Sequence, residues 1–423
     1  MKENTMPNTP AALTTDQIAY LTDLRQHLHQ QPEISGEEEQ TGARIAQELA
    51  RAGADRIWTG LGGHGVAAEF AGKRPGPTVM IRCELDALPI PEISQAPYRS
   101  QVEGKGHLCG HDGHMVMVLG LALALHARPA QGRVILLFQP AEETGAGAEA
   151  VIKDPRWPEL RPDYAFAYHN VPGRPLGEVG LCRGVSNCAS RGMKIRLTGK
   201  TSHAAAPEDG VSPGAVMSHL MQSLPALGPG GAMGADFALA TLTHAQLGEP
   251  TFGIAPGTGE LRMTLRSQTD ARMDRLVKDS TAQVDLALAN AGGALDNTAA
   301  PTADVSWHDV FLATVNDDQA IDVVQNAATR LGAPVVAMSA PMRWSEDFGR
   351  FGLDGAKAAM VFIGSGEDQP QLHNPNFDFP DALTATGVAL WGEIVQQVLG
   401  GQDADLIPSD DALPTQKADG GAG

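Results

Sequence analysis

Positive charge is scarce in this sequence. Its 423 residues hold 31 lysines and arginines against 50 aspartates and glutamates, giving a formal net charge of -19. A surface this acidic repels nucleic acid and anionic membranes, so we expect neither as a partner. An anionic substrate would need positive charge supplied locally at its own site.

Long hydrophobic runs and a disulfide framework are also missing. The longest apolar stretches, such as MVMVLGLALAL, fall short of the roughly 20 residues that a membrane-spanning helix needs. The first residues, MKENTMPNTPAALTTDQ, show no secretory pattern, so we expect a cytoplasmic location. The spacing of the four cysteines suggests no disulfide framework, which fits a reducing cytosol: Cys83, Cys109, Cys182 and Cys188.

Strand-like and helical segments alternate in the first part of the chain, and the chain is too long for one core. The expected strands are 65–70, 78–83 and 133–138, and the expected helices are 16–29, 38–52 and 115–127. This alternation predicts an α/β fold, with a mostly parallel sheet and helices on both faces.

The pattern changes near residue 187. From there to about 310 the order becomes strand-helix-strand-strand-helix-strand, which is typical of a small α+β split βαβ sandwich. We therefore expect five segments: a flexible N-terminus (1–16), a catalytic domain in two parts (17–187 and 311–400), an inserted domain (188–310) and a disordered tail (401–423).

The motif HLCGHDGH, residues 107–114, is the densest chemical signal. One residue separates Cys109 from His111, and Gly110 lets the backbone turn so that both side chains reach one point. Thiolate and imidazole together suit a borderline or soft divalent metal. A buried cysteine beside packing histidines is the alternative, but the flanking glycines and the aspartate favour a metal site.

Two further motifs carry carboxylates at the ends of apolar runs. In LLFQPAEETGAG, Glu142 and Glu143 follow a buried strand, where α/β sheets place their ligands. One can bind metal while the other takes a proton from water. In RCELDALPI, Asp86 is placed to orient a histidine ligand, or is an ordinary turn residue.

Three histidines stand at the ends of elements. His169 ends an apolar run, His203 lies in GKTSHAAAP within the inserted domain, and His373 lies in LHNPNFDFPD before the last helix. Any one of them taken alone is more often structural than a ligand.

Together these motifs resemble a known group of enzymes. The series LHQQPEISGEE, RCELDALPI, HLCGHDGH, FQPAEE, YHNVPG, GKTSHAAAP, SEDF and LHNPNFDFPD is similar to the aminoacylase/carboxypeptidase superfamily of metallopeptidases. It most resembles the branch of indole-3-acetyl-amino acid, hippurate and aminobenzoyl-glutamate hydrolases. The resemblance covers about residues 17–400.

The resemblance implies two divalent metal ions per subunit, Mn²⁺ or Zn²⁺, with Co²⁺ as a further candidate. The implied ligands are Cys109, His111, Glu143, His169 and His373. It implies that Glu142 is the general base.

The inserted domain corresponds to a lid that also forms dimers, so a homodimer or homotetramer is expected. His203 matches a lid histidine that reaches the substrate, and Arg266 matches an arginine that binds the substrate carboxylate. Arg262, on the same strand face, is the alternative. The family usually has aspartate where this chain has Glu84, and the Gly/Pro-rich stretch ALGPGGAMGAD departs from the usual lid.

The predicted function is metal-dependent hydrolysis of the amide bond of N-acyl or N-aroyl amino acids, which are small molecules with a free carboxylate. A dipeptidase or carboxypeptidase of the same superfamily is the alternative. Two hypotheses from other functional classes are a cysteine hydrolase that uses Cys109 and a metal-stabilised binding protein. Neither the acyl group nor the preferred amino acid can be read from the sequence.

Overall fold

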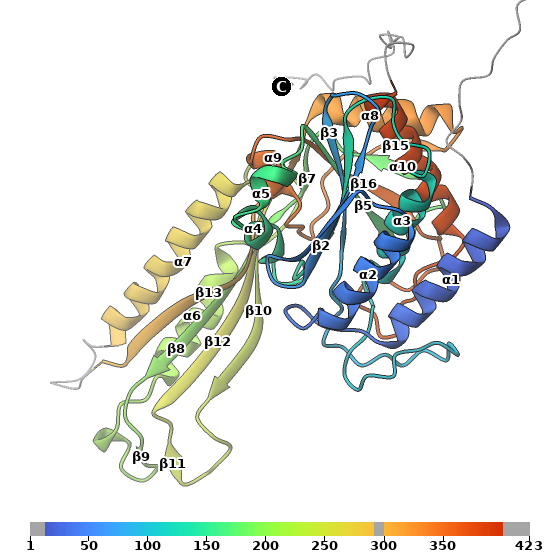
Figure 1. Ribbon diagram of the computed structural model, residues 1–423. Coiled ribbons are helices and arrows are strands. Elements are labelled where there is room, and N and C mark those ends of the chain that lie inside the picture. Colours follow the sequence, from blue (N-terminus) through green and yellow to red (C-terminus); the bar gives the residue numbers. More distant parts are fainter. Residues whose placement is uncertain (1–12, 292–299, 401–423) are drawn as a thin grey trace, which may run out of the picture.

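The chain forms two units of different shape. The computed structural model describes residues 13–291 and 300–400, so the predicted tail and most of the predicted flexible N-terminus lie outside the described residues. A large α/β unit carries an elongated second unit that projects from its side (Figure 1). None of the helices within the described ranges is long and apolar enough to cross a membrane.

The large unit is built on an eight-stranded sheet of order β1-β2-β4-β3-β5-β16-β6-β15. The strands are β1 Arg56–Leu61, β2 Gly65–Ala71, β3 Thr78–Glu84, β4 Arg133–Gln139, β5 Tyr164–Val171, β6 Val179–Leu181, β15 Val335–Ala337 and β16 Lys357–Gly364. The four central strands β4, β3, β5 and β16 are parallel, which confirms the predicted sheet. Their carboxyl ends therefore meet at one edge of the sheet, where ligands bind in this fold class.

Helices cover both faces of this sheet. One core joins it to α1 Thr15–Gln30, α2 Glu39–Arg51, α3 His111–Ala124, α8 Asp318–Arg330 and α10 Leu383–Leu399. The opposite core joins it to α4 Gly147–Ile152, α5 Trp157–Leu160 and α9 Gly349–Leu353. Along β3, Val79 and Ile81 face the first core and Met80 the second, as the two-residue period of a strand requires. A strand buried on both faces has a nearly continuous run of apolar residues, and such runs predicted β3 and β4.

The projecting unit, which we call the lid, holds a second sheet of order β10-β12-β8-β13 with every pair antiparallel. Its elements are β8 Ala189–Thr198, α6 Gly214–Ala226, β10 Ala238–Leu247, β12 Thr258–Ser267, α7 Asp270–Ala291 and β13 Thr302–Phe311. This is the order expected from the sequence. The pair β9 Ser202–His203 and β11 Ile254–Ala255 lies at the end of the lid farthest from the large sheet, and β7 Gly184–Asn187 pairs with β14 Thr314–Asn316 where the units join (Figure 1).

The start of α3 differs from the prediction in a useful way. The helix begins at His111, not at 115, because Gly110 adopts a left-handed backbone with φ 97° and starts the helical turn. Three polar residues of HLCGHDGH, His111, Asp112 and His114, therefore lie in the first turn of a buried helix. Side chains of that turn point at the carboxyl ends of the central strands.

Candidate metal centre

The five side chains that the resemblance marks as ligands meet at the carboxyl edge of the large sheet. Cys109 Sγ lies 3.3 Å from Nε2 of His169. Glu143 stands between two histidines, with Oε1 3.9 Å from Nε2 of His111 and Oε2 3.6 Å from Nε2 of His373. Donor atoms of Cys109 lie within 4.8 Å of His111 and His169 in one group and of Glu143 and His373 in another. The cysteine thus stands between two adjoining sets of ligands.

Gly110 allows Cys109 and His111 to point the same way. A Cβ added to it would lie 2.4 Å from Oδ1 of Asn170, so only glycine fits here as well as adopting the positive φ. His111 Nδ1 is held 2.8 Å from the main-chain oxygen of Asp86, which leaves Nε2 to face the cluster. His169 is oriented in the same manner, with Nδ1 2.9 Å from the main-chain oxygen of Asn170.

Two other polar residues of HLCGHDGH, Asp112 and His114, are anchors. Asp112 accepts hydrogen bonds from Arg25 at 3.2 Å and from His29 at 2.9 Å, all three being fully buried. His114 lies 2.7 Å from both Glu84 and Asn170, so both of its ring nitrogens are occupied. The unusual Glu84 is therefore a buried partner of His114.

Arg25 also ties the metal helix to the loop of His373. Its Nη1 lies 2.6 Å from Asp378 and its Nε 2.7 Å from Asp381, a few residues beyond His373. The His373 amide donates to the carbonyl of Leu108 at 2.8 Å, and His373 has a left-handed φ of 64°. Contacts on both sides thus hold this half-exposed ligand over the cluster.

Glu142 and Glu143 leave β4 through a sharp turn. Ala141 has a φ of 49°, and its amide donates to the buried carboxylate of Glu38 at 2.8 Å. Burial raises the pKa of Glu142 well above its usual value, and the charges of Glu346 and Glu143 raise it further. Burial and then Asp86 raise the pKa of Glu143 in the same direction. Several carboxyl groups packed this closely cannot all carry charge without cations beside them.

Asp86 supports this turn more than it supports a histidine. Its carboxylate accepts from Ser35 at 2.7 Å and from the amide of Glu143 at 2.9 Å, while its closest approach to His111 Nδ1 is 3.7 Å. Burial raises its pKa to about 6 against the opposing effect of the Ser35 hydrogen bond. The histidine is oriented by the main-chain oxygen of Asp86 and not, as the sequence suggested, by its side chain.

One carboxylate of the site had no assigned role in the sequence analysis. Glu346, in the motif SEDF, is buried with Oε1 3.8 Å from Nε2 of His169. Burial raises its pKa to about 7, with Arg82 opposing and Asp347 adding to the shift. Arg82 is fully buried beneath the site, 2.7 Å from Asp347, and also pairs with Glu84. The motif SEDF, which belongs to the resemblance, was the available signal, but nothing in its spacing indicated a buried position.

The donor set fits divalent cations. Among the described residues, three buried atoms of the cluster lack a hydrogen-bond partner: Nε2 of His111 and Oε1 of both Glu142 and Glu143. Leaving such atoms unsatisfied costs about 1–3 kcal/mol each, which bound cations would remove. Thiolate, imidazole and carboxylate together suit zinc and neighbouring first-row metals. Burial raises the pKa of the Cys109 thiol, an effect that a bound cation reverses.

A cavity of about 360 Å³ opens onto this cluster, with one wall from the large sheet and one from the base of the lid. Arg266 lines it and donates to the carbonyl of Arg343 and to Ser345 Oγ, both at 3.1 Å. Across the described residues no carboxylate lies within ion-pair distance of Arg266. Arg262 lies four residues earlier in β12, exposed and paired with Glu260 at 2.6 Å. Of the two arginines, Arg266 is the one that lines the cavity.

The structure does not bring His203 to this cavity. His203 lies on β9 at the far end of the lid, exposed, with Nδ1 3.0 Å from the amide of Ala205 (Figure 1). The length of the lid strands separates it from the cluster. The role of His203 at the substrate remains a prediction. It requires that the lid move or that the lid of a second copy approach this cavity.

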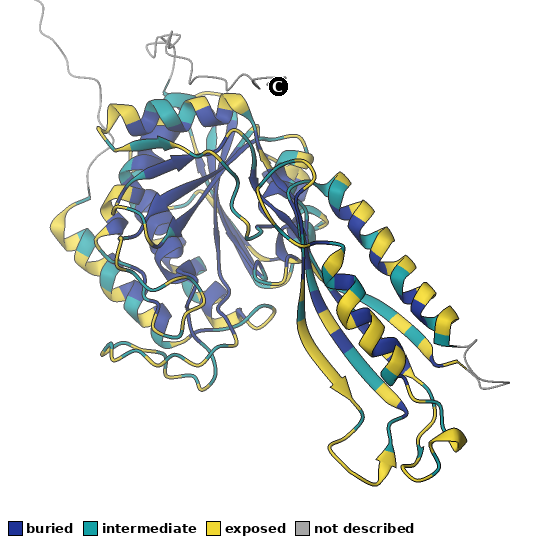
Figure 2. Cartoon of the chain, turned by 180° about the vertical axis from the view of Figure 1, so that it is seen from behind, coloured by how far each residue is buried: buried dark blue, intermediate teal, exposed yellow. Residues whose placement is uncertain are grey.

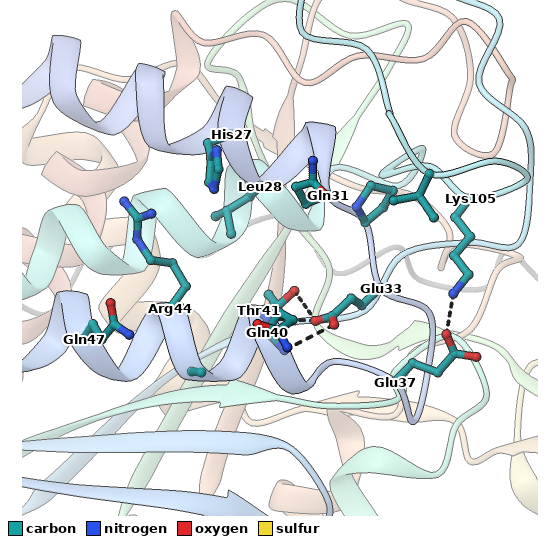
Figure 3. A pocket seen from close by; sticks show the side chains of 13 residues that line it. His27, Leu28, Gln31, Glu33, Glu37, Gln40, Thr41, Arg44, Gln47 and Lys105 are labelled. Atoms are coloured by element: carbon teal, nitrogen blue, oxygen red, sulfur yellow. Dashed lines mark hydrogen bonds and ion pairs between the residues drawn. The ribbon is translucent and has the colours of Figure 1, made fainter.

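A second cavity, of about 520 Å³, lies between α1 and α2 (Figure 3). Its acidic side chains are already engaged, because Glu33 accepts from Thr41 at 2.8 Å and Glu37 pairs with Lys105. None of the metal-capable groups found in the described ranges lies there. The chemistry is therefore concentrated at the sheet edge.

Comparison with known proteins agrees with this geometry. The model of peptidase family M20/M25/M40 matches residues 80–397. The chain belongs to this family. Among its relatives is an N-acetyl-L-cysteine deacetylase of Bacillus subtilis (strain 168), 32% identical over 389 residues that cover 92% of this chain and 90% of the relative.

Two further M20/M25/M40 relatives extend the likeness. A hippurate hydrolase of Campylobacter jejuni is 28% identical, over 89% of this chain and 96% of its own. The structure of the Bacillus subtilis YXEP protein, described as a dinuclear metal binding peptidase, superposes with a TM-score of 0.74 at 25% identity, covering 91% of this chain and 99% of that one. The predicted family, fold and hydrolase class are confirmed.

Proposed function

We propose that this chain hydrolyses the amide bond of N-acyl amino acids with the help of two divalent metal ions. The observation that carries the proposal is the cluster of Cys109, His111, Glu143, His169 and His373, with Glu142 beside it and Arg266 across the cavity. Relatives named N-acetyl-L-cysteine deacetylase and hippurate hydrolase support this reaction, and the dinuclear relative supports two ions.

The ions would be held by the five clustered side chains, with Cys109 between the two positions. Bound there, they would lower the pKa of a water molecule and polarise the substrate carbonyl. Manganese or zinc, with cobalt as a further candidate, fits the donor set. The four cysteines are buried and form no disulfide bonds, which supports a reducing compartment. The proposal therefore includes a cytoplasmic location.

The chain's own residues would divide the remaining work. Glu142 takes a proton from the attacking water and returns it to the departing nitrogen, because an amine leaves poorly unless protonated. Burial holds the pKa of Glu142 well above the usual carboxyl value, which favours the uptake of a proton. Asp86 holds the turn of Glu143 through its hydrogen bond to that amide.

Arg266 would bind the substrate carboxylate from the lid side. Its guanidinium supplies the local positive charge that a protein of net charge -19 otherwise lacks. His203 would reach the substrate only after a lid movement or from a second copy of the chain. The second possibility is the reason for proposing a homodimer or homotetramer.

The test is a panel of N-acyl amino acids on protein stripped with EDTA: hippurate, indole-3-acetyl-aspartate, aminobenzoyl-glutamate, N-acetyl-cysteine and N-acetyl-methionine. We expect no activity after stripping and recovery with manganese or zinc. Hydrolysis that ignores EDTA would overturn the metal mechanism and favour a Cys109 thiol enzyme.

A dipeptidase or carboxypeptidase activity is the second candidate, because thermostable carboxypeptidases of Saccharolobus solfataricus are 28% identical to this chain. Such an enzyme would use the same cluster and the same Arg266. A dipeptide and an N-blocked dipeptide belong in the panel, and preference for either would move the assignment.

A further inference from the structure

The guanidinium of Arg266 is held across the junction between the lid and the large unit. Side chains from both units line the cavity beside the metal cluster, among them Ser190, Arg266, Phe311, Trp344 and Ser345. Arg266 belongs to the lid strand β12, and its two acceptors lie in the segment between β15 and α9 of the large unit. Its Nη1 donates to Ser345 Oγ and to the main-chain oxygen of Arg343, both at 3.1 Å. Because an Nη carries two hydrogens, these two bonds occupy Nη1 completely.

The other edge of this guanidinium has no partner in the protein. Among the described residues, neither Nε nor Nη2 of Arg266 makes a hydrogen bond, and no carboxylate lies within ion-pair distance. Nε and Nη2 form one edge of the planar fork, and such an edge can donate to both oxygens of one carboxylate. The contacts of Nη1 therefore leave a complete carboxylate-binding edge on an arginine that lines the cavity.

The segment that supplies the two acceptors is fixed at both of its ends. At one end, Met342 forms main-chain hydrogen bonds in both directions: its amide donates to Ser186 O at 2.8 Å, and its oxygen accepts from the amide of Cys188 at 3.1 Å. At the other end, Glu346 is buried, and its main-chain oxygen accepts from Thr314 Oγ1 at 3.2 Å. The acceptors of Arg266 thus stand on a rigid support.

The Gly/Pro-rich stretch ALGPGGAMGAD, residues 226–236, contributes to the same junction. Arg343 Nη2 donates to the main-chain oxygen of Gly231 at 2.9 Å, and its guanidinium lies 5.5 Å from the ring centroid of the buried Phe237. Gly231 has a φ of 109°, a conformation that glycine adopts without strain. This stretch, which departs from the usual lid, therefore holds the residue whose main-chain oxygen holds Arg266.

We propose that Ser345 and the main-chain oxygen of Arg343 orient Arg266 for the carboxylate of the substrate, an inference that rests on the proposed function. A free arginine side chain has many rotamers, and binding a ligand with it costs the entropy of fixing one of them. Two hydrogen bonds on one end of the guanidinium fix its plane before the substrate arrives. Ser345 is thus a positioning residue, which acts on carboxylate recognition through Arg266.

The test measures the preference for a carboxylate over a carboxamide on the full-length, metal-loaded enzyme. The substrate pairs are N-acetyl-L-methionine with N-acetyl-L-methioninamide, and hippurate with hippuramide. The preference is the ratio of kcat/KM values within a pair. Ser345→Ala should lower this ratio roughly 5-fold through the KM of the carboxylate substrate, while kcat and the carboxamide kinetics stay within about 2-fold of wild type. Ser345→Thr, which keeps a hydroxyl, should retain the wild-type ratio.

A double-mutant cycle separates positioning from structural support. In an Arg266→Ala background, Ser345→Ala should not change the ratio further, because no guanidinium remains to be oriented. Arg343→Ala keeps the main-chain acceptor but releases it from the lid loop, so it should lower the ratio in the same direction, by roughly 3-fold. A wild-type ratio in Arg343→Ala would overturn the part assigned to the Gly/Pro-rich stretch.

The matched control is Ser267→Ala. Ser267 follows Arg266 in β12, so it lies on the opposite face of the strand, where it is buried and donates to Thr269 O at 2.9 Å. Its removal costs a hydrogen bond of the same kind and should leave the ratio unchanged.

Four outcomes would overturn the positioning role of Ser345. They are a wild-type enzyme without preference for the carboxylate, a wild-type ratio in Ser345→Ala, an equal loss with the carboxamide, and a further loss in the Arg266→Ala background. If neither carboxylate substrate is cleaved although two metals are bound, the proposed function itself fails, and this inference falls with it.

Discussion

The two walls of the cavity are built in different ways. On the sheet wall, the central strands are buried on both faces, and almost every chemical side chain is fixed by a buried partner (Figure 2). His111, His169 and Asp112 each bond to a main-chain oxygen or a buried charge. On the lid wall, Arg266 and Phe311 stand at the base of a thin sheet whose edge strand β10 is exposed along its far half (Figure 2).

This difference separates two tasks. Bond cleavage requires donor atoms held to within a fraction of an ångström, which the buried strand ends provide. Substrate selection tolerates more movement, and the lid wall supplies one charge from β12 and one ring from β13. Substitutions on the sheet wall should therefore affect kcat or metal content, and those on the lid wall should affect KM and specificity.

The largest expected effect separates two adjacent glutamates of the sheet wall. Glu142→Gln should lower kcat about 10³-fold, because the amide cannot accept the proton, while metal content stays unchanged. Glu143→Gln should lose bound metal as well, since its carboxylate stands between His111 and His373. Steady-state kinetics and metal analysis of the purified variants measure both quantities. Near-normal kcat in Glu142→Gln would refute its role as base.

The next effect compares two arginines of the lid. Arg266→Ala should lower kcat/KM about 100-fold, mainly through KM, because a charge-assisted contact to the substrate carboxylate is lost. Arg262→Ala, which removes an exposed arginine already paired with Glu260, should stay within about 2-fold of wild type. A substrate whose carboxylate is replaced by a carboxamide should be equally poor for wild type and Arg266→Ala. A larger loss in Arg262→Ala would reverse the assignment.

A smaller effect concerns the far end of the lid. His203→Ala should lower kcat about 10-fold if the histidine reaches a substrate, although the structure places it away from its own chain's cavity. In a dimer where each lid end serves the other copy, mixing His203→Ala with Glu142→Gln subunits should recover about a quarter of wild-type activity, because each hybrid holds one intact site. Co-purification of an untagged variant subunit with a tagged one confirms that the subunits exchange. No recovery would place the action of His203 within its own chain, and wild-type kcat in His203→Ala would remove its role.

The sequence predicted the sheet wall well for a physical reason. Strands of a parallel sheet end at one edge, so Glu143 and His169, which follow separate apolar runs, were expected to lie near each other. The resemblance added Cys109, which the structure places within 4.8 Å of donor atoms of both. Arg266 was marked by the resemblance alone, and alternation along its strand could not separate it from Arg262 on the same face.

The remaining parts depended on packing that local pattern does not encode. Glu346 and Trp344 come from an irregular segment with no period to indicate burial, and Phe311 reaches the cavity only because β13 pairs with β8 at that register. The carboxylate of Asp86 supports the Glu143 turn, a partner too distant in sequence to be read from a motif. The position of His203 follows from the length of the lid strands.

The last prediction concerns His29, whose contact with Asp112 anchors the sheet wall. At neutral pH the His29→Gln variant should have almost unchanged activity. Burial lowers the pKa of His29, but its hydrogen bond and charge contact with Asp112 outweigh this and raise it to about 10. Because that value lies above the ordinary histidine pKa, the contact stabilises the fold fully below about pH 6.5 and is lost as pH rises toward 10. The free energy of unfolding of wild type, relative to His29→Gln, should therefore fall by on the order of 3 kcal/mol across this range. His27→Gln, an exposed histidine of the same helix, should follow the wild-type curve. Parallel curves for His29→Gln and wild type would show that His29 is not held in its charged form by Asp112.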